Sequence, residues 1–199
     1  MKKSPDYNLP INPRYGIPAL SWSDVLAIES GWFGAKKLQS KALDYGTHIH
    51  KMIEHGHYDV PRLGNPETVF QTEIPISPRS KKKFIIIGKV DDHNDTTILD
   101  YKTGRVPWTH KKASEHQQFH VYALIKWKAT GVAPTKGKLV WLETCPHEDS
   151  DSMALTGTMR VFEFPITLLD MLKVQTRFVK AYHTVMSNDS KLGTLQLTQ

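Results

Sequence analysis

The residues best suited to chemistry in this sequence are Asp91, Asp100 and Lys102. Side chains two positions apart on a β-strand share a face, so Asp100 and Lys102 point the same way if this segment is a strand. A two-residue hairpin loop at Asn94-Asp95 places Asp91 diagonal to Asp100, at roughly 7–8 Å between Cα atoms. A slip of one residue would send Asp91 to the other face, so this placement depends on the turn.

These three side chains predict a metal-assisted hydrolytic site. Two convergent carboxylates offer the hard oxygen ligands that Mg²⁺ or Mn²⁺ prefers. The neighbouring Lys102 is suited to orienting or deprotonating a metal-bound water and to offsetting charge on a phosphate. The alternative from these residues alone is an ordinary solvated hairpin with a surface ion pair.

A histidine upstream is a candidate partner for the carboxylates. Gly46 lies one helical turn before His50 on the same face, where a backbone is able to approach closely. His48 and His50 are roughly 200° apart around a helix, so they cannot both reach one ion. One histidine acting with carboxylates from elsewhere is the functional interpretation, and a capped or core histidine is the alternative for His50.

Polar and basic residues surround this segment. Gln118 and Tyr122 are four apart and therefore neighbours on one helix face, although such a pair also occurs at the boundary between core and solvent. Cationic groups near an aromatic ring suit a nucleic-acid backbone and a stacked base. The expected nucleic-acid contacts are Lys81, Lys82, Lys83, Arg105, Trp108, Lys111 and Lys112. For the lysine run, the alternative is a solvated loop.

Composition narrows the class of protein. Of 199 residues, 39% are apolar and 23% charged, as in an ordinary globular protein. There are 26 Lys and Arg against 20 Asp and Glu, and the net charge of +6 favours a polyanionic partner. No apolar run suits a membrane span or secretory signal, so we expect a cytoplasmic protein. The single cysteine, Cys145, excludes an intrachain disulfide, a zinc knuckle and a four-cysteine iron–sulfur cluster.

The element pattern predicts a mixed α/β sandwich. Prolines in residues 1–19 indicate an extended arm, and Ser21 or Ser23 is suited to cap a short helix. We expect further helices at about 41–55, from the capping-box spacing of 114–117 to about 129, and from about 167. Strands are expected at 69–76, 84–91, 96–102, 138–143 and 159–164. We divide this single domain into 1–45 (arm and short helices), 46–187 (core) and 188–199 (flexible tail).

The motifs together resemble a known family. Gly46-x-x-x-His50, Gly88-x-x-Asp91, Asp100-Tyr101-Lys102-Thr103-Gly104 and Gln118-x-x-x-Tyr122 are similar, in order and spacing, to the RecB-like exonuclease branch of the PD-(D/E)XK nuclease superfamily. The resemblance implies a restriction-endonuclease-like mixed β-sheet core flanked by helices, with an N-terminal helical region.

The resemblance also implies roles for individual residues. His50, Asp91 and Asp100 become metal ligands, together with the carbonyl of Tyr101. Lys102 becomes the catalytic lysine, while Gln118 and Tyr122 support the site and contact DNA. Glu73 falls where many relatives carry an acidic residue. The sequence departs from the family at Asp92, where a basic residue is common, and in lacking the cysteines of an iron–sulfur cluster.

From these observations we expect a Mg²⁺- or Mn²⁺-dependent deoxyribonuclease, free-standing and of a kind that bacteriophages encode. Its expected activity is exonucleolytic, on single-stranded DNA or single-stranded ends, in DNA recombination, repair, replication or degradation. Aromatic and basic residues within 22–41 suit helices that arch over such a strand. A recombinase, helicase or single-strand-binding protein is left open as a partner. The alternatives are a structure-selective endonuclease and an inactive nuclease-fold module that binds DNA.

Overall fold

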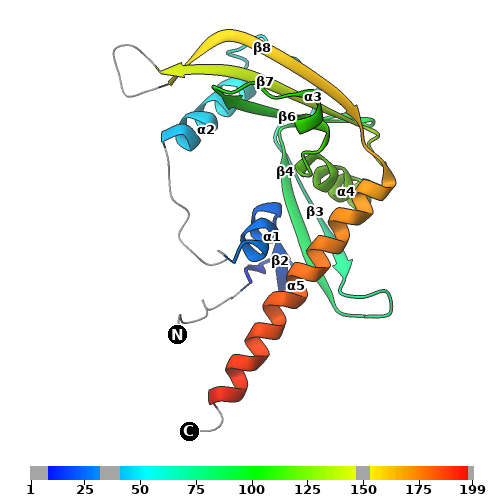
Figure 1. Ribbon diagram of the computed structural model, residues 1–199. Coiled ribbons are helices and arrows are strands. Elements are labelled where there is room, and N and C mark those ends of the chain that lie inside the picture. The colour runs from blue at the N-terminus through cyan, green and yellow to red at the C-terminus, as the bar shows by residue number, and fades with distance from the viewer. Residues whose placement is uncertain (1–8, 32–40, 147–152, 197–199) are drawn as a thin grey trace.

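The computed structural model describes residues 9–31, 41–146 and 153–196, with the backbone alone for 41–43 and 188–196 (Figure 1). The strands are β1 (Ile11–Asn12), β2 (Ile17–Leu20), β3 (Thr68–Pro75), β4 (Lys83–Val90), β5 (Asp92–His93), β6 (Thr97–Gly104), β7 (Lys136–Pro146) and β8 (Met153–Pro165). The helices are α1 (Trp22–Glu29), α2 (Lys41–Glu54), α3 (His110–Ser114), α4 (Gln118–Thr130) and α5 (Leu168–Gln196).

The strands form two mixed sheets, which confirms the expected α/β architecture. The first has the order β1-β2-β4-β3, with β2 parallel to β4. The second has the order β5-β6-β7-β8, with β6 parallel to β7. The remaining neighbours in both sheets pair antiparallel. The chain passes from the first sheet to the second between β4 and β5, at Asp91.

Helices cover the second sheet on both faces, because successive β6 side chains point to opposite sides. Leu99 and Tyr101 pack with Ile49 and Ile53 of α2 in one apolar cluster. Ile98 packs with α4, and this larger cluster also includes side chains of α1, β4 and α5. The middle of α4, from Phe119 to Ile125, is buried all round. α2 and α4 are therefore the two helices that present side chains to β6.

The N-terminal segment is part of the sheet rather than a free arm. β1 and β2 are extended, as the prolines predict, but a turn at residues 13–16 joins them in a hairpin, and β2 pairs with β4 through Ala19 and Leu20. Ser21 is the N-cap of α1, where its hydroxyl accepts from Asp24 N–H at 3.3 Å and Asp24 Oδ2 accepts from Ser21 N–H at 2.8 Å. This reciprocal pair is a capping box.

Two expectations about helix ends were wrong. The capping-box spacing at Ser114 does not open α4, because Ser114 ends α3 and its hydroxyl donates to the carbonyl of Lys111 at 3.0 Å. α4 begins after Gln117, which makes no side-chain cap. The closing helix α5 continues to Gln196, past residue 188 where a tail was expected, and it runs beyond the sheets in Figure 1.

A close contact between β7 and β8 predicts a stability effect. Gly137 lies opposite Phe164, and a methyl group at Gly137 would overlap the Phe164 ring. That ring is 3% exposed and packs edge-on against Phe119 at 4.9 Å between centroids, so it has little room to retreat. We expect Gly137→Ala to lower the free energy of unfolding by about 1–3 kcal/mol, measured by denaturant titration.

Gly104→Ala in β6 is the matched control for that substitution. A methyl group there would meet its nearest neighbour, Trp141 Nε1, at an ordinary 3.8 Å. Equal unfolding free energies for the two variants would contradict the predicted clash.

Candidate active site

Asp91 lies at the junction of the two sheets and faces the middle of β6. β5 pairs antiparallel with β6, with Asp92 opposite Leu99. Because His93 pairs with Ile98, residues 94–97 connect the paired residues of the two strands. The expected connection had two residues fewer, Asn94 and Asp95 alone. If the same register is continued by one residue beyond Asp92, Asp91 lies directly opposite Asp100 rather than diagonal to it. Because the shift is an even number of residues, both carboxylates keep the face predicted for them.

Backbone hydrogen bonds hold Asp91 in this place. Its Oδ2 accepts from Tyr101 N–H at 2.8 Å, and its carbonyl accepts from Glu67 N–H at 2.9 Å. Burial, followed by the nearby charge of Asp100, raises the pKa of Asp91 to about 7. Burial and the neighbouring Asp100 carboxylate therefore both disfavour the ionised form of Asp91.

Asp100 and Lys102 meet on β6, as their spacing predicts. Lys102 Nζ lies 2.7 Å from Asp100 Oδ2 and donates to Gln118 Oε1 at 3.1 Å. The Asp100 side chain is 2% exposed, and within the described residues its Oδ2 has the ion-pair contact with Lys102 but no well-directed hydrogen bond. The Lys102 ammonium thus lies between Asp100 and Gln118, and its side chain is 24% exposed.

The first turns of α4 bring Gln118 and Tyr122 to the site. Gln118 donates from its amide nitrogen to the Tyr122 hydroxyl. Burial raises the pKa of Tyr122, so this hydroxyl stays protonated. The approach of α4 requires Gly88 on β4, because a Cβ there would lie 3.1 Å from both the Tyr122 ring and Ile125. The glycine of the Gly88-x-x-Asp91 motif thus makes room for the helix that carries Gln118.

α2 brings His50 to the edge of the same group. His50 Nδ1 lies 3.6 Å from Asp91 Oδ2, and His50 also hydrogen-bonds the backbone of Tyr101. Burial lowers the pKa of His50, so its contact with Asp91 involves a neutral imidazole. Gly46 permits the approach, since a Cβ there would lie 3.3 Å from Thr103 Oγ1 on β6.

Two further acidic residues considered from the sequence lie elsewhere. Asp92 faces away from Asp91, and its carboxylate accepts from the backbone N–H groups of Leu63 at 2.6 Å and Asn65 at 2.8 Å. Asp92 therefore anchors the loop before β3. Glu73 lies on the edge strand β3, exposed and ion-paired with Lys83, and does not join the site.

Sequence reasoning missed Glu67. It ion-pairs with Lys89 and helps to line a pocket of about 170 Å³ beside His50 and Asp91. Its backbone φ is +52°, a left-handed conformation that is uncommon outside glycine. No sequence pattern indicates that Glu67 lies near the site. Its position depends on the loop before β3, which Asp92 anchors through long-range hydrogen bonds.

Sequence reasoning also missed His116. Its Nε2 lies 3.1 Å from Gln118 Oε1, the oxygen that accepts from Lys102. The His116 ring packs edge-on against Trp108, with 5.1 Å between centroids. The available signal was its position two residues before Gln118, which becomes informative only once the bend between α3 and α4 is known.

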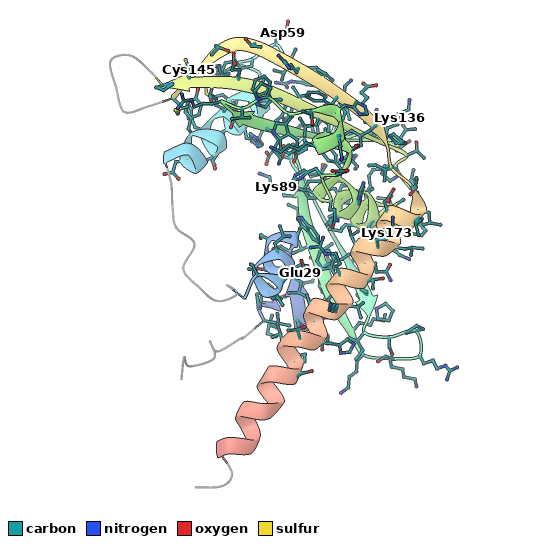
Figure 2. The ribbon with its side chains drawn as sticks, viewed as in Figure 1. Glu29, Asp59, Lys89, Lys136, Cys145 and Lys173 are labelled. Carbon is teal, nitrogen blue, oxygen red and sulfur yellow. The ribbon has the colours of Figure 1, made fainter. Side chains whose placement is uncertain are left out.

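The expected nucleic-acid contacts divide into two groups. Trp108 is connected to the site by its ring contact with His116, which in turn contacts Gln118. The Lys112 ammonium lies 4.3 Å from the centre of the Trp108 ring. Exposed Arg105 and Lys111 flank them in sequence. The other group, Lys81, Lys82 and Lys83, lies at the opposite end of β4 from Asp91, a separation of roughly 26 Å at 3.3 Å per strand residue. Figure 2 shows Lys89 on the inner side of the molecule, toward the site end of this strand.

The aromatic residues of the proposed arch are only partly described. Trp22 packs against Phe178 at 5.9 Å between centroids, and the Arg177 guanidinium lies 4.5 Å from its ring centre. Trp22 thus packs α1 against α5. Residues 32–40, with the other aromatic and basic members of that segment, lie outside the described residues, as does the side chain of Lys41.

The chemistry of His50, Asp91 and Asp100 fits a divalent cation. Their donor atoms are carboxylate oxygens and one neutral imidazole, and the buried Asp100 Oδ2 lacks a hydrogen bond in the described structure. A cation would also relieve the repulsion that raises the pKa of Asp91. Across the described ranges, no three His, Cys, Asp or Glu side chains form a ready-made set of ligands, so these side chains would have to draw together around an ion.

Several solved structures are similar to this protein in fold. The structure is similar to a phage-related exonuclease from Haemophilus somnus 129PT, with 13% sequence identity and a TM-score of 0.50 over 85% of this chain and 82% of that one. It is also similar to a candidate exonuclease from Eubacterium rectale (10% identity, TM-score 0.48, 81% and 73% covered). LHK-Exo, solved in complex with dAMP, is a further similar structure (14% identity, TM-score 0.44, 89% and 93% covered). At these identities the likeness concerns the fold alone.

No curated protein sequence matches this chain. None of the helices in the described residues has the length and apolar character needed to cross a membrane. The model of the PD-(D/E)XK nuclease superfamily matches residues 59–160, just over half of the chain. The matched segment includes the sheet junction at Asp91, the Asp100–Lys102 pair on β6 and Gln118 on α4. The chain therefore belongs to the PD-(D/E)XK nuclease superfamily.

Proposed function

We propose that this protein is a Mg²⁺- or Mn²⁺-dependent deoxyribonuclease that degrades single-stranded or tailed DNA from an end. The observation that carries the proposal is the convergence of Asp91, Asp100 and Lys102 where the two sheets meet, with Gln118 holding the lysine. Two largely buried carboxylates and a partly exposed ammonium are groups suited to metal-assisted phosphodiester hydrolysis.

Each residue of the site has a task in this proposal. His50, Asp91, Asp100 and the Tyr101 carbonyl hold the cation, which when bound activates water and offsets charge on the phosphate. Lys102 directs its remaining N–H toward the attacking water or a phosphate oxygen, where negative charge develops. Asp100 and Gln118 hold the Lys102 ammonium between them, so it needs little reorganisation during the reaction. Tyr122 supports Gln118 from the next turn of α4.

Charge and aromatic residues support a nucleic-acid substrate. The net charge is +6, the Lys112 ammonium lies over the Trp108 ring, and the nearby residues Arg105 and Lys111 are exposed. Cations that follow phosphates and a ring that stacks on a base bind single strands with little sequence preference. Lys81, Lys82 and Lys83 lie roughly 26 Å from the metal ligands, a distance estimated from the rise per residue of β4. They would therefore contact only DNA that extends this far from the site.

Digestion of end-labelled DNA tests the proposal and separates it from its rivals. With Mg²⁺ or Mn²⁺ we expect a linear single strand to be degraded and a circular single strand of the same sequence to survive. Chelation of the metal should stop the reaction. A linear strand with streptavidin at both ends should resist digestion, and the same strand with one free end is the matched control.

The contrary outcomes are distinct. Cleavage of the circle, or rapid loss of the doubly blocked strand, would show that no end is needed and would indicate an endonuclease. Binding of these DNAs without cleavage under either metal would instead support an inactive nuclease-fold module.

A further inference from the structure

We propose that His116 is a positioning residue, which orients Gln118 and through it holds Lys102 in place. The inference rests on the proposed nuclease function and names a residue outside the four motifs. It starts from the contacts around the Gln118 amide. Gln118 Oε1 lies 3.1 Å from Lys102 Nζ and 3.1 Å from His116 Nε2, and the Gln118 amide nitrogen donates to Tyr122.

The chemistry of these groups sets the direction of each hydrogen bond. A lysine ammonium has donors only, so the atom that faces Lys102 must be the carbonyl oxygen of Gln118 and not its amide nitrogen. That oxygen can only accept, which makes His116 Nε2 a donor. Burial lowers the pKa of His116, so the ring is neutral, and its single proton is therefore on Nε2.

Without His116, the amide of Gln118 would lose one of the three contacts that define its orientation. Lys102 would then be held chiefly by Asp100, whose Oδ2 lies 2.7 Å away. The ammonium would be drawn toward the carboxylates and away from the face where a phosphate must lie. His116 is therefore expected to affect the placement of Lys102 rather than the binding of DNA.

The other side of His116 reaches the proposed DNA contacts. Its ring packs edge-on against Trp108 at 5.1 Å and against Phe119 at 6.1 Å between centroids, and Lys112 stands over the Trp108 ring. His116 thus lies between an aromatic side chain suited to stacking on a base and the network that holds the lysine. Its ring is fixed by packing on two sides, which is the property a positioning residue needs.

The main experiment compares two substitutions of this histidine. His116→Phe keeps the ring packing but removes the N–H, whereas His116→Gln places an amide N–H near the position of Nε2. We expect His116→Phe to lower the single-turnover cleavage rate about three- to tenfold, the range that one neutral hydrogen bond supports. His116→Gln should restore most of the rate. DNA affinity, measured with Ca²⁺, should stay unchanged in both.

A double-mutant cycle shows whether the effect passes through Gln118. In a Gln118→Ala background, His116→Phe should cause no further loss. His110→Phe is the matched control, because His110 contacts the carbonyl of Glu163 instead of the lysine network. A wild-type rate for His116→Phe, additive losses in the cycle, or no rescue by His116→Gln would each overturn the proposal.

A readout without catalysis separates this proposal from the proposed function. The ¹⁵N spectrum of the histidine side chains should show the Nε2–H tautomer for His116, and Gln118→Ala should shift that resonance. An Nδ1–H tautomer would refute the positioning role even if the protein cleaves DNA. The expected spectrum in a protein that cleaves no DNA would uphold the network and reject the nuclease function.

Discussion

Lys102→Ala is expected to slow DNA hydrolysis by about 10²–10³-fold, the loss that follows removal of one well-placed donor to developing charge. The ammonium is held between Asp100 and Gln118 with part of its surface open to solvent, so it is suited to contact the substrate without anchoring the fold. DNA affinity should change little, since the lysine acts in the transition state rather than in binding. Single-turnover rates and affinities measured in parallel test this expectation.

Two further variants sharpen the Lys102 experiment. Lys102→Met keeps the length of the side chain and removes its charge, and it should be as slow as Lys102→Ala. Lys173→Ala is the control, because Lys173 is 64% exposed and pairs with Asp170 on α5, outside the site and the proposed DNA contacts. Turnover of Lys102→Met near the wild-type rate would remove the lysine from the mechanism.

Asp100→Asn and Asp91→Asn are each expected to abolish metal-dependent activity and to reduce Mn²⁺ binding below detection by calorimetric titration. Both carboxylates lie at the sheet junction, where burial and the nearby charge of Asp100 raise the pKa of Asp91, an effect that a bound cation would offset. His50→Ala should weaken Mn²⁺ binding or change the preference between Mg²⁺ and Mn²⁺ while leaving some activity, since a single neutral ligand is lost.

The metal-free proteins provide the control for that experiment. Burial and the nearby charge of Asp100 disfavour the ionised form of Asp91, so the melting temperature of Asp91→Asn without metal should equal or exceed that of the wild type. Asp95→Asn, in the exposed turn between β5 and β6, should bind Mn²⁺ normally. Undiminished binding by Asp100→Asn would reject the proposed site, and undiminished binding by His50→Ala alone would return that histidine to a structural role.

The separation of the lysine cluster from the site illustrates what local sequence cannot show. Lys81, Lys82 and Lys83 precede Asp91 by only a few residues, yet β4 is extended and places them at its far end. Trp108 and Lys112 follow Lys102 by a comparable number of residues, but a loop and the bend between α3 and α4 return them to the site. Distance along the chain therefore did not predict distance from the metal ligands.

The sequence by itself determined the parts of this protein that depend on local periodicity. The common face of Asp100 and Lys102 follows from the two-residue repeat of a strand, and the pairing of Gln118 with Tyr122 follows from the four-residue repeat of a helix. Both are present in the structure. The mixed α/β class and most elements were predicted for the same reason.

Only the tertiary structure decided how these local pieces meet. The parallel pairing of β2 with β4 joins residues far apart in the chain, and no local pattern specifies it. The length of the turn between β5 and β6 fixed the register that places Asp91 opposite Asp100. The Ser114 hydroxyl, which had suggested an N-cap, instead donates to the Lys111 carbonyl within α3. The contact between His116 and Gln118 lies where α3 ends and α4 begins, at a bend that the sequence pattern did not predict. Long-range packing selects among local alternatives of similar free energy, and for that reason sequence patterns alone left these features open.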